Sequence, residues 1–355
     1  MQARSLRMSA ALMVMAVAAV VSPASAQEEL PPKLEAPKPT FLGDIEDERQ
    51  EGLDYSIYSA LQISVSDNLN VLGQTDGLNF LFGFKLDTSV AWNQGPWEWR
   101  TAAGVAGGVA RTPLIAELVK ARDFTSLDST LLFHATPYFG PFARFALNTT
   151  LFIGADVRPA ETSYVIARAD GTTDAVLRRR LRTTDPLKPL TLKESLGPFL
   201  QPLTTDPLSV EARAGVGARQ SFADGQLALA DDPATAAVEI REMTDAHQIG
   251  VEAAVELWGA LSQKRITYKI TADVLVPFAY TALPPGDARG ALELMNVSLL
   301  GSVSFQLVEW AKLDYELRMV REPLLIDRLQ MQNNLLIGFG FLHPEPVDEL
   351  CPCAK

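Results

Sequence analysis

The chain has 355 residues, a formal net charge of −12 and a sequence pI near 4.8. This acidic balance argues against nucleic-acid binding, which relies on basic side chains at the phosphates. After residue 26 the sequence contains no uninterrupted apolar run of about 20 residues, so a helical membrane protein is excluded.

The first 26 residues have the pattern of a secretory signal peptide. Arg4 and Arg7 form its positive region, residues 8–21 form its apolar core, and Ala24-Ser25-Ala26 is a small-residue cleavage site. We therefore predict cleavage between Ala26 and Gln27. No Cys follows this site, so a lipoprotein is not expected.

The two ends of the predicted mature chain differ from its body. Residues 27–54 are proline-rich and then acidic, which predicts an extended linker. Residues 343–355 form a tail that contains the only two cysteines, Cys351 and Cys353. A body without cysteine has neither a disulfide scaffold nor a Cys-x-x-Cys metal site. We interpret the cysteine pair as tail thiols rather than as a metal or redox centre.

The first strongly patterned stretch is a hairpin. Phe82, Phe84 and Leu86 alternate with small or charged residues, residues 93–96 form a turn, and the alternation resumes at Trp97. Because side chains alternate faces along a strand, this hairpin has one apolar and one polar face. Its strands exceed the usual length of about 5–6 residues and reach the 9–11 or so that cross a bilayer.

The same alternation recurs along the chain and favours a closed antiparallel up-and-down transmembrane β-barrel over a soluble β-sandwich. The predicted strands are residues 55–66, 80–93, 97–111, 129–136, 144–151, 208–219, 249–257, 266–274, 295–305, 313–319 and 329–341. Bacterial barrels have an even number of strands. We therefore predict about 12 strands within residues 55–342, with a weak twelfth in residues 225–243 and a long irregular loop over 158–207.

With that twelfth strand, the connections sort by length onto two sides. The short ones lie near Gly95, Gly140, Asp224, Gln263 and Val308, and the longer ones span residues 67–77, 111–126, 158–207, 279–290 and 322–328. Barrels have short periplasmic turns and longer outer loops. Both termini, the linker and the tail are thus predicted to be periplasmic.

The tryptophans test this arrangement independently, because aromatic residues gather at membrane interfaces. All five are predicted to form an aromatic girdle on the short-turn rim: Trp92, Trp97, Trp99, Trp258 and Trp310.

The polar face collects charges of both signs. The residues predicted to face the lumen are Lys85, Asp87, Glu98, Arg100, Arg144, Glu211, Arg213, Glu252, Glu256, Lys269, Asp273, Lys312, Asp314, Glu316 and Arg318. Such charges either tune the selectivity of a solute path or pair with one another in a lumen that does not conduct. The sequence leaves both interpretations open.

Catalytic signals are weak. No GxSxG, HExxH or phosphate-loop motif occurs. A lipid-directed Ser-His-acid site needs its members on the outer wall, whereas His134 lies on the predicted inward face. We predict no catalytic residue, no metal ligand and no cofactor.

A basic cluster lies in the predicted long loop and consists of Arg178, Arg179, Arg180 and Arg182. It either contacts lipopolysaccharide phosphates or is a solvated cluster. The expected partners are outer-membrane lipid and lipopolysaccharide, the barrel-assembly machinery and, if the lumen conducts, small solutes; nucleic acid is not expected.

The chain resembles Gram-negative outer-membrane β-barrel proteins, and more specifically an uncharacterised barrel family known as a domain of unknown function. The resemblance rests on Trp92-Asn93-Gln94-Gly95 before a glycine-rich strand (103–109), Asp128, the corner at 137–141 and the closing strand 335–341. It implies an outer-membrane location and no established activity. One departure is Leu336, which stands where a glycine is expected before the closing aromatic residues.

The predicted function is an outer-membrane barrel of uncharacterised role, with passive passage of small solutes as the preferred interpretation. A structural or surface-interaction barrel without conduction is the first alternative. An envelope lipid-modifying enzyme is the second.

Overall fold

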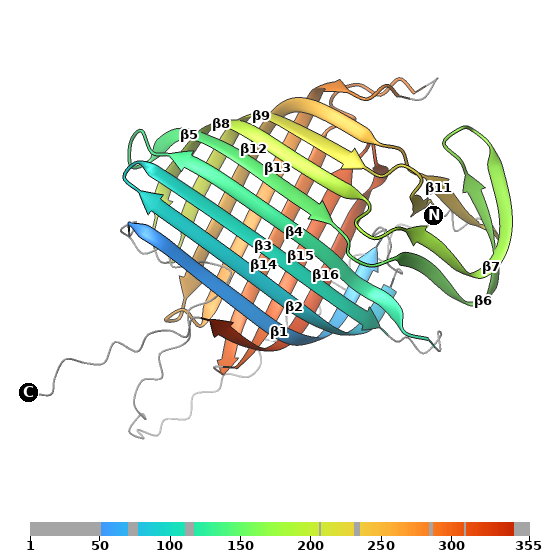
Figure 1. Ribbon diagram of the computed structural model, residues 1–355, viewed down its shortest axis with the longest axis horizontal. Helices are drawn as coiled ribbons and strands as arrows, with labels where there is room; N and C mark the ends of the chain where they lie inside the picture. The colour runs from blue at the N-terminus through green and yellow to red at the C-terminus, as the bar shows by residue number, and fades with distance from the viewer. Residues whose placement is uncertain are drawn as a thin grey trace, which may run out of the picture. The chain divides into compact units, whose positions relative to one another are not determined.

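The computed structural model describes residues 51–69, 77–110, 117–205, 207–230, 235–283, 287–308 and 310–343 (Figure 1). The predicted signal peptide, nearly all of the linker, and the cysteine-containing tail lie outside the described residues.

Antiparallel strands close into a barrel of twelve, in the order β1-β2-β3-β4-β5-β8-β9-β12-β13-β14-β15-β16. Because β1 pairs with both β2 and β16, the barrel has no open edge. This confirms the predicted fold class. The barrel strands are β1 (Gly52–Leu69), β2 (Gly77–Gln94), β3 (Trp97–Ala110), β4 (Val119–Phe133), β5 (Phe139–Thr149), β8 (Leu190–Thr204), β9 (Ser209–Phe222), β12 (Ala246–Leu261), β13 (Ile266–Tyr280), β14 (Asn296–Val308), β15 (Ala311–Glu322) and β16 (Ile326–His343).

A second sheet, called the side sheet below, is built from two of the connections. It contains β6 (Gly154–Ala167), β7 (Thr173–Thr184), β10 (Leu227–Leu229) and β11 (Val238–Glu242) in the order β10-β11-β6-β7. The strands β6 and β7 come from the β5–β8 connection, and β10 and β11 from the β9–β12 connection. The side sheet has its own apolar core, in which Tyr164 and Ile240 are almost fully buried.

The predicted identity of the twelfth barrel strand is wrong. Residues 225–243 contribute to the side sheet, and the missing barrel strand is β8, inside the stretch predicted to be an irregular loop. Figure 1 shows β8 between β5 and β9 in the barrel wall. Pro198 and Pro202 concealed this strand, because proline cannot donate a hydrogen bond to a sheet. Gly197, which directly precedes Pro198, comes so close to β9 that an added Cβ would lie 2.0 Å from the Ala214 carbonyl oxygen.

With β8 as the twelfth barrel strand, two connections differ from the prediction. The short turn at residues 205–208 joins β8 to β9, and Asp224 lies at the opposite end of the barrel, with the long connections. The connection from Glu322 to Ile326 is also shorter than predicted. The remaining alternation of short and long connections agrees with the prediction.

The outward face of the barrel is apolar and exposed on every strand, and we call this surface the outer belt. Exposed members, one from each strand in wall order, are Leu61, Phe82, Val109, Leu131, Phe145, Leu196, Val216, Val251, Ile270, Phe305, Tyr315 and Leu335. A continuous exposed apolar surface of this kind is the architecture of barrels that face lipid. Among the described residues, no helix has the length and apolar character needed to cross a membrane.

Candidate functional site in the barrel lumen

The inward face carries the charges, because alternation along each strand places them opposite the outer belt. All the predicted lumen-facing residues lie on inward positions of barrel strands. They come from β2 (Lys85, Asp87), β3 (Glu98, Arg100), β5 (Arg144), β9 (Glu211, Arg213), β12 (Glu252, Glu256), β13 (Lys269, Asp273) and β15 (Lys312, Asp314, Glu316, Arg318).

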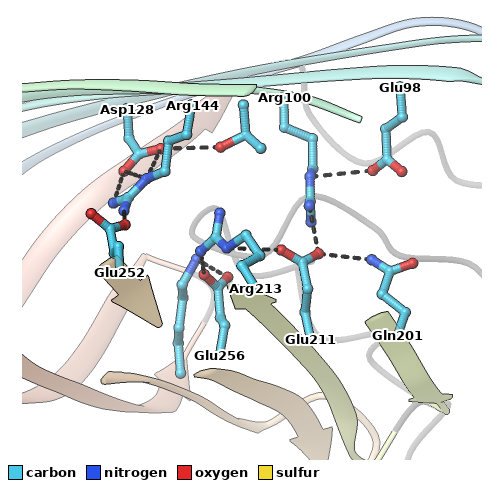
Figure 2. Close-up of polar contacts among 11 residues, drawn as sticks. Glu98, Arg100, Asp128, Arg144, Gln201, Glu211, Arg213, Glu252 and Glu256 are labelled. Atoms are coloured by element: carbon cyan, nitrogen blue, oxygen red, sulfur yellow. Dashed lines mark hydrogen bonds and ion pairs between the residues drawn. The ribbon is translucent and has the colours of Figure 1, made fainter. Parts of the chain in front are cut away.

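Glu211 is the centre of the first ion-pair network. Its Oε2 lies 2.6 Å from Arg100 Nη2 and accepts a hydrogen bond of 2.8 Å from Gln201 Nε2 (Figure 2). The strands β4, β5 and β8 separate β3 from β9 in the wall, so the Arg100–Glu211 pair crosses the lumen. Glu211 is only 1% exposed, and a carboxylate so deeply buried needs such partners.

Arg213 extends this network to the next strands. Its Nε lies 3.4 Å from Glu211 Oε1, and its Nη2 lies 3.3 Å from Glu256 Oε2. Glu256 also pairs with Lys269 on β13 at 2.5 Å. Carboxylates and cations therefore alternate from β9 through β12 to β13.

Arg144 links β4, β5 and β12. Its Nη2 lies 2.5 Å from Asp128 Oδ2, and its Nη1 lies 3.9 Å from Glu252 Oε1 (Figure 2). Asp128 thus belongs to the lumen as well as to the sequence pattern that carried the family resemblance.

A second network crosses the lumen between β4 and β15. Arg122 Nη2 lies 2.7 Å from Glu316 Oε2, and Lys85 Nζ lies 3.1 Å from Glu316 Oε1. Arg122 also donates a hydrogen bond of 3.1 Å to Gln62 Oε1 on β1. Lys312 Nζ lies 3.6 Å from the centre of the Tyr58 ring, a cation–π contact. Polar side chains on the four strands β1, β2, β4 and β15 therefore contact one another in the lumen.

A smaller network lies near the long-connection end. Arg219 on β9 pairs with Asp273 at 3.3 Å and with Glu322 at 3.1 Å. Arg219 lies near the end of β9 that leads into the long connection. Ion pairs therefore occur toward both ends of the lumen.

An apolar cluster fills part of the lumen toward the short-turn end. Leu132, Phe142 and Phe199 are each 4% exposed or less and pack on one another. His134 stands beside them, with its ring in an edge-to-face contact with Phe199 at 5.0 Å. These three apolar side chains are therefore shielded from solvent.

The structure places His134 in the lumen wall, where its Nε2 lies 2.7 Å from Glu98 Oε2. The nearby Ser129 faces outward and accepts a hydrogen bond from Trp99 Nε1 at 2.8 Å. His134 follows the end of β4 and contacts the inward Glu98, whereas the Ser129 hydroxyl contacts the outward Trp99, so the two do not form a nucleophile and base pair.

The tryptophans all lie toward the short-turn end, but they do not form one girdle. Trp97 and Trp99 are exposed on the outer face, Trp92 is directly opposite Trp99, and Trp310 stacks on Phe339. Trp258 is an exception, because it is only 4% exposed and occupies an inward position opposite Lys269. Its assignment to the girdle is wrong.

Arg122 and Gln201 are among the lumen residues that sequence reasoning missed. Arg122 precedes the predicted start of the fourth strand at residue 129, whereas β4 begins at Val119. Gln201 lies in β8, which was not predicted. The signal that could have found Arg122 is its even spacing from Asp128 and Thr130, which continues the inward series.

No family model and no curated protein matches the chain. Solved barrel structures do match. The translocator domain of the autotransporter NalP from Neisseria meningitidis is 9% identical, with 82% of this chain and 90% of that chain covered and a TM-score of 0.35. The NanC porin is 7% identical, with coverages of 79% and 99% and a TM-score of 0.36. An outer membrane channel from Pseudomonas putida F1 is 9% identical, with coverages of 84% and 100% and a TM-score of 0.37. At these identities the likeness concerns the barrel architecture, which the strand pairing establishes by itself.

Proposed function

We propose that this protein is an outer-membrane barrel whose lumen is closed by ion pairs and which acts through the side sheet at its long-connection end. The observation that carries the proposal is the pair of cross-lumen bridges, Arg122–Glu316 and Arg100–Glu211. The outer belt supports placement in a membrane, and the predicted signal peptide supports export to the outer one.

Two features favour closure over free conduction. First, a twelve-stranded barrel lies between eight strands, which side chains can fill, and sixteen, which leave a channel. Its interior is narrow enough for Arg100 to reach Glu211. Second, the predicted lumen charges other than Arg318, which lies over the Phe124 ring, form ion pairs within the lumen. Selective pores commonly present rings of charge of one sign instead. A solute would have to separate these pairs in order to pass.

The test is liposome swelling with refolded full-length protein. Wild-type liposomes are expected to exclude small sugars, and the variant Glu211→Ala/Glu316→Ala is expected to admit them because both bridges are removed. Val251→Ala on the outer belt is the matched control and should behave as wild type, with heat-modifiable gel mobility showing that every barrel is folded. Rapid swelling of wild-type liposomes in sugars would overturn the proposal.

Passage of small solutes is the second candidate, and one observation favours it. Leu300 on β14 pairs with Thr271 and Arg318, which are on inward positions, yet its side chain is 41% exposed. Part of the lumen therefore has room for solvent. Under this candidate, wild-type liposomes swell in small amino acids and the Leu300→Trp variant slows that swelling.

A further inference from the structure

The feature outside the lumen with the strongest charge is strand β7, which carries the basic cluster Arg178, Arg179, Arg180 and Arg182. In the order β10-β11-β6-β7, this strand is at an edge of the side sheet. The side chains of Arg179, Arg180 and Arg182 are 48%, 63% and 59% exposed. Their guanidinium groups are therefore available to a partner.

The carboxylates around this cluster are too few to neutralise it. Arg179 and Arg180 share Glu117, at 3.4 and 3.7 Å, and Arg182 pairs with Asp185. Among the described residues, Arg178 has no ion pair. Exposed pairs of this kind contribute about 0–1 kcal/mol and are easily exchanged for another anion. The cluster thus has surplus positive charge in an acidic protein.

The position of the cluster indicates what kind of anion it meets. Glu117 is followed directly by Leu118, which is 65% exposed, and Phe152 near the start of β6 is 48% exposed. Phe152 lies beside Phe84 of the outer belt, because both rings approach Gly107. Lys120 of β4 donates a hydrogen bond of 3.0 Å to the Phe152 carbonyl oxygen. The arginines therefore adjoin the end of the outer belt, which is where lipid headgroups begin in a membrane barrel.

We propose that the basic cluster of β7 binds the phosphate groups of a phosphorylated glycolipid, of the lipopolysaccharide kind, in the leaflet that surrounds the long-connection end. This rests on the membrane placement in the proposed function. The planar guanidinium group of arginine binds phosphate oxygens in a bidentate manner. Arg179 and Arg180 both reach the single carboxylate of Glu117, so their guanidinium groups can converge on one headgroup.

The competing explanation is that the charges only keep an unpaired strand edge from joining another sheet. That role requires charge but no particular ligand, so binding measurements separate the two. Native mass spectrometry of the full-length protein in detergent, titrated with diphosphoryl lipid A, supplies the measurement.

We expect the variant Arg178→Gln/Arg179→Gln/Arg180→Gln/Arg182→Gln to bind diphosphoryl lipid A at least about tenfold more weakly than wild type, the loss of roughly one charge-assisted hydrogen bond or more. The matched control is Lys264→Gln/Arg265→Gln in the short turn between β12 and β13, which should retain wild-type binding. Glu117→Gln should bind more tightly, because it removes the carboxylate that competes for Arg179 and Arg180.

Equal binding by wild type and the four-arginine variant would overturn the proposal. Inorganic phosphate that displaces the lipid at millimolar concentration would also overturn it, since the site would then be one for free phosphate. Heat-modifiable mobility of each variant shows that the barrel is folded. Conductance is not part of this readout, so a wild-type barrel that conducts sugars refutes the closed lumen without refuting the lipid site.

Discussion

Arg122 on β4 and Glu316 on β15 are 2.7 Å apart, although β3, β2, β1 and β16 lie between their strands in the barrel wall. The two residues are on nearly opposite sides of the lumen. Glu316 also holds Lys85, so one carboxylate serves two cations. Four predictions follow from this filling of the lumen and from the outer belt around it.

Removing the shared carboxylate should destabilise the barrel. We expect Glu316→Gln to lower the free energy of unfolding by about 2 kcal/mol, because Lys85 and Arg122 then lose a common partner in a partly desolvated space. Urea unfolding of the protein folded in lipid vesicles measures this. Glu161→Gln, the same chemical change at an exposed position of β6, should alter it by less than about 0.5 kcal/mol. Equal effects of the two substitutions would show that the cross-lumen contact does not form.

The Arg100–Glu211 bridge should appear as energetic coupling. In a double-mutant cycle of Arg100→Ala and Glu211→Ala, we expect a coupling energy of about 1–3 kcal/mol, as found for directly interacting side chains. The pair Arg100→Ala and Glu161→Ala provides the control, because those residues are on different sheets and their effects should add. Additive effects for Arg100 and Glu211 would contradict the bridge.

The apolar cluster in the lumen should contribute by packing. Phe199→Ala should cost about 3–5 kcal/mol, since it opens a cavity among Leu132, Phe142 and His134. On the same strand, Leu196 is 64% exposed on the outer face, so Leu196→Ala should cost much less. Unfolding midpoints of the two variants in one detergent make the comparison, and a reversed order would mean that the faces of β8 are misassigned.

An introduced charge should destabilise the barrel when it lies on the outer belt, but not when it lies in the lumen. We expect Val251→Arg to destabilise the barrel by about 2–4 kcal/mol, the cost of a cation on the lipid face near the bilayer centre. Leu300→Arg should be tolerated, because that position faces the partly exposed lumen. The fraction of each variant that folds into vesicles, measured by heat-modifiable gel mobility, distinguishes Val251→Arg from Leu300→Arg. Equal tolerance at both positions would argue that Val251 faces water.

The strand faces could be predicted because their signal is local. Alternation with a period of two can be recognised from consecutive residues alone. Lys85, Glu211 and Glu316 could therefore be assigned to the lumen without knowledge of which residues they contact. The even strand number was also correct, because a bacterial up-and-down barrel that closes with an antiparallel pair, here β1 with β16, has an even number of strands.

The predicted strand identities failed where local chemistry opposed the global arrangement. Pro198 and Pro202 weaken β8 as an isolated strand, yet pairing with β5 and β9 retains it in the wall. Trp258 was assigned to the outer rim from its nearness to a turn, but its inward register at Lys269 buries it.

The sequence by itself determined that apolar and charged side chains lie on opposite faces of long antiparallel strands, because that pattern needs only neighbouring residues. Only the tertiary structure decided which charges meet. Arg122 and Glu316 are 194 positions apart in sequence, and their contact depends on the closure and stagger of all twelve strands, which set the width of the lumen and the level of each side chain within it.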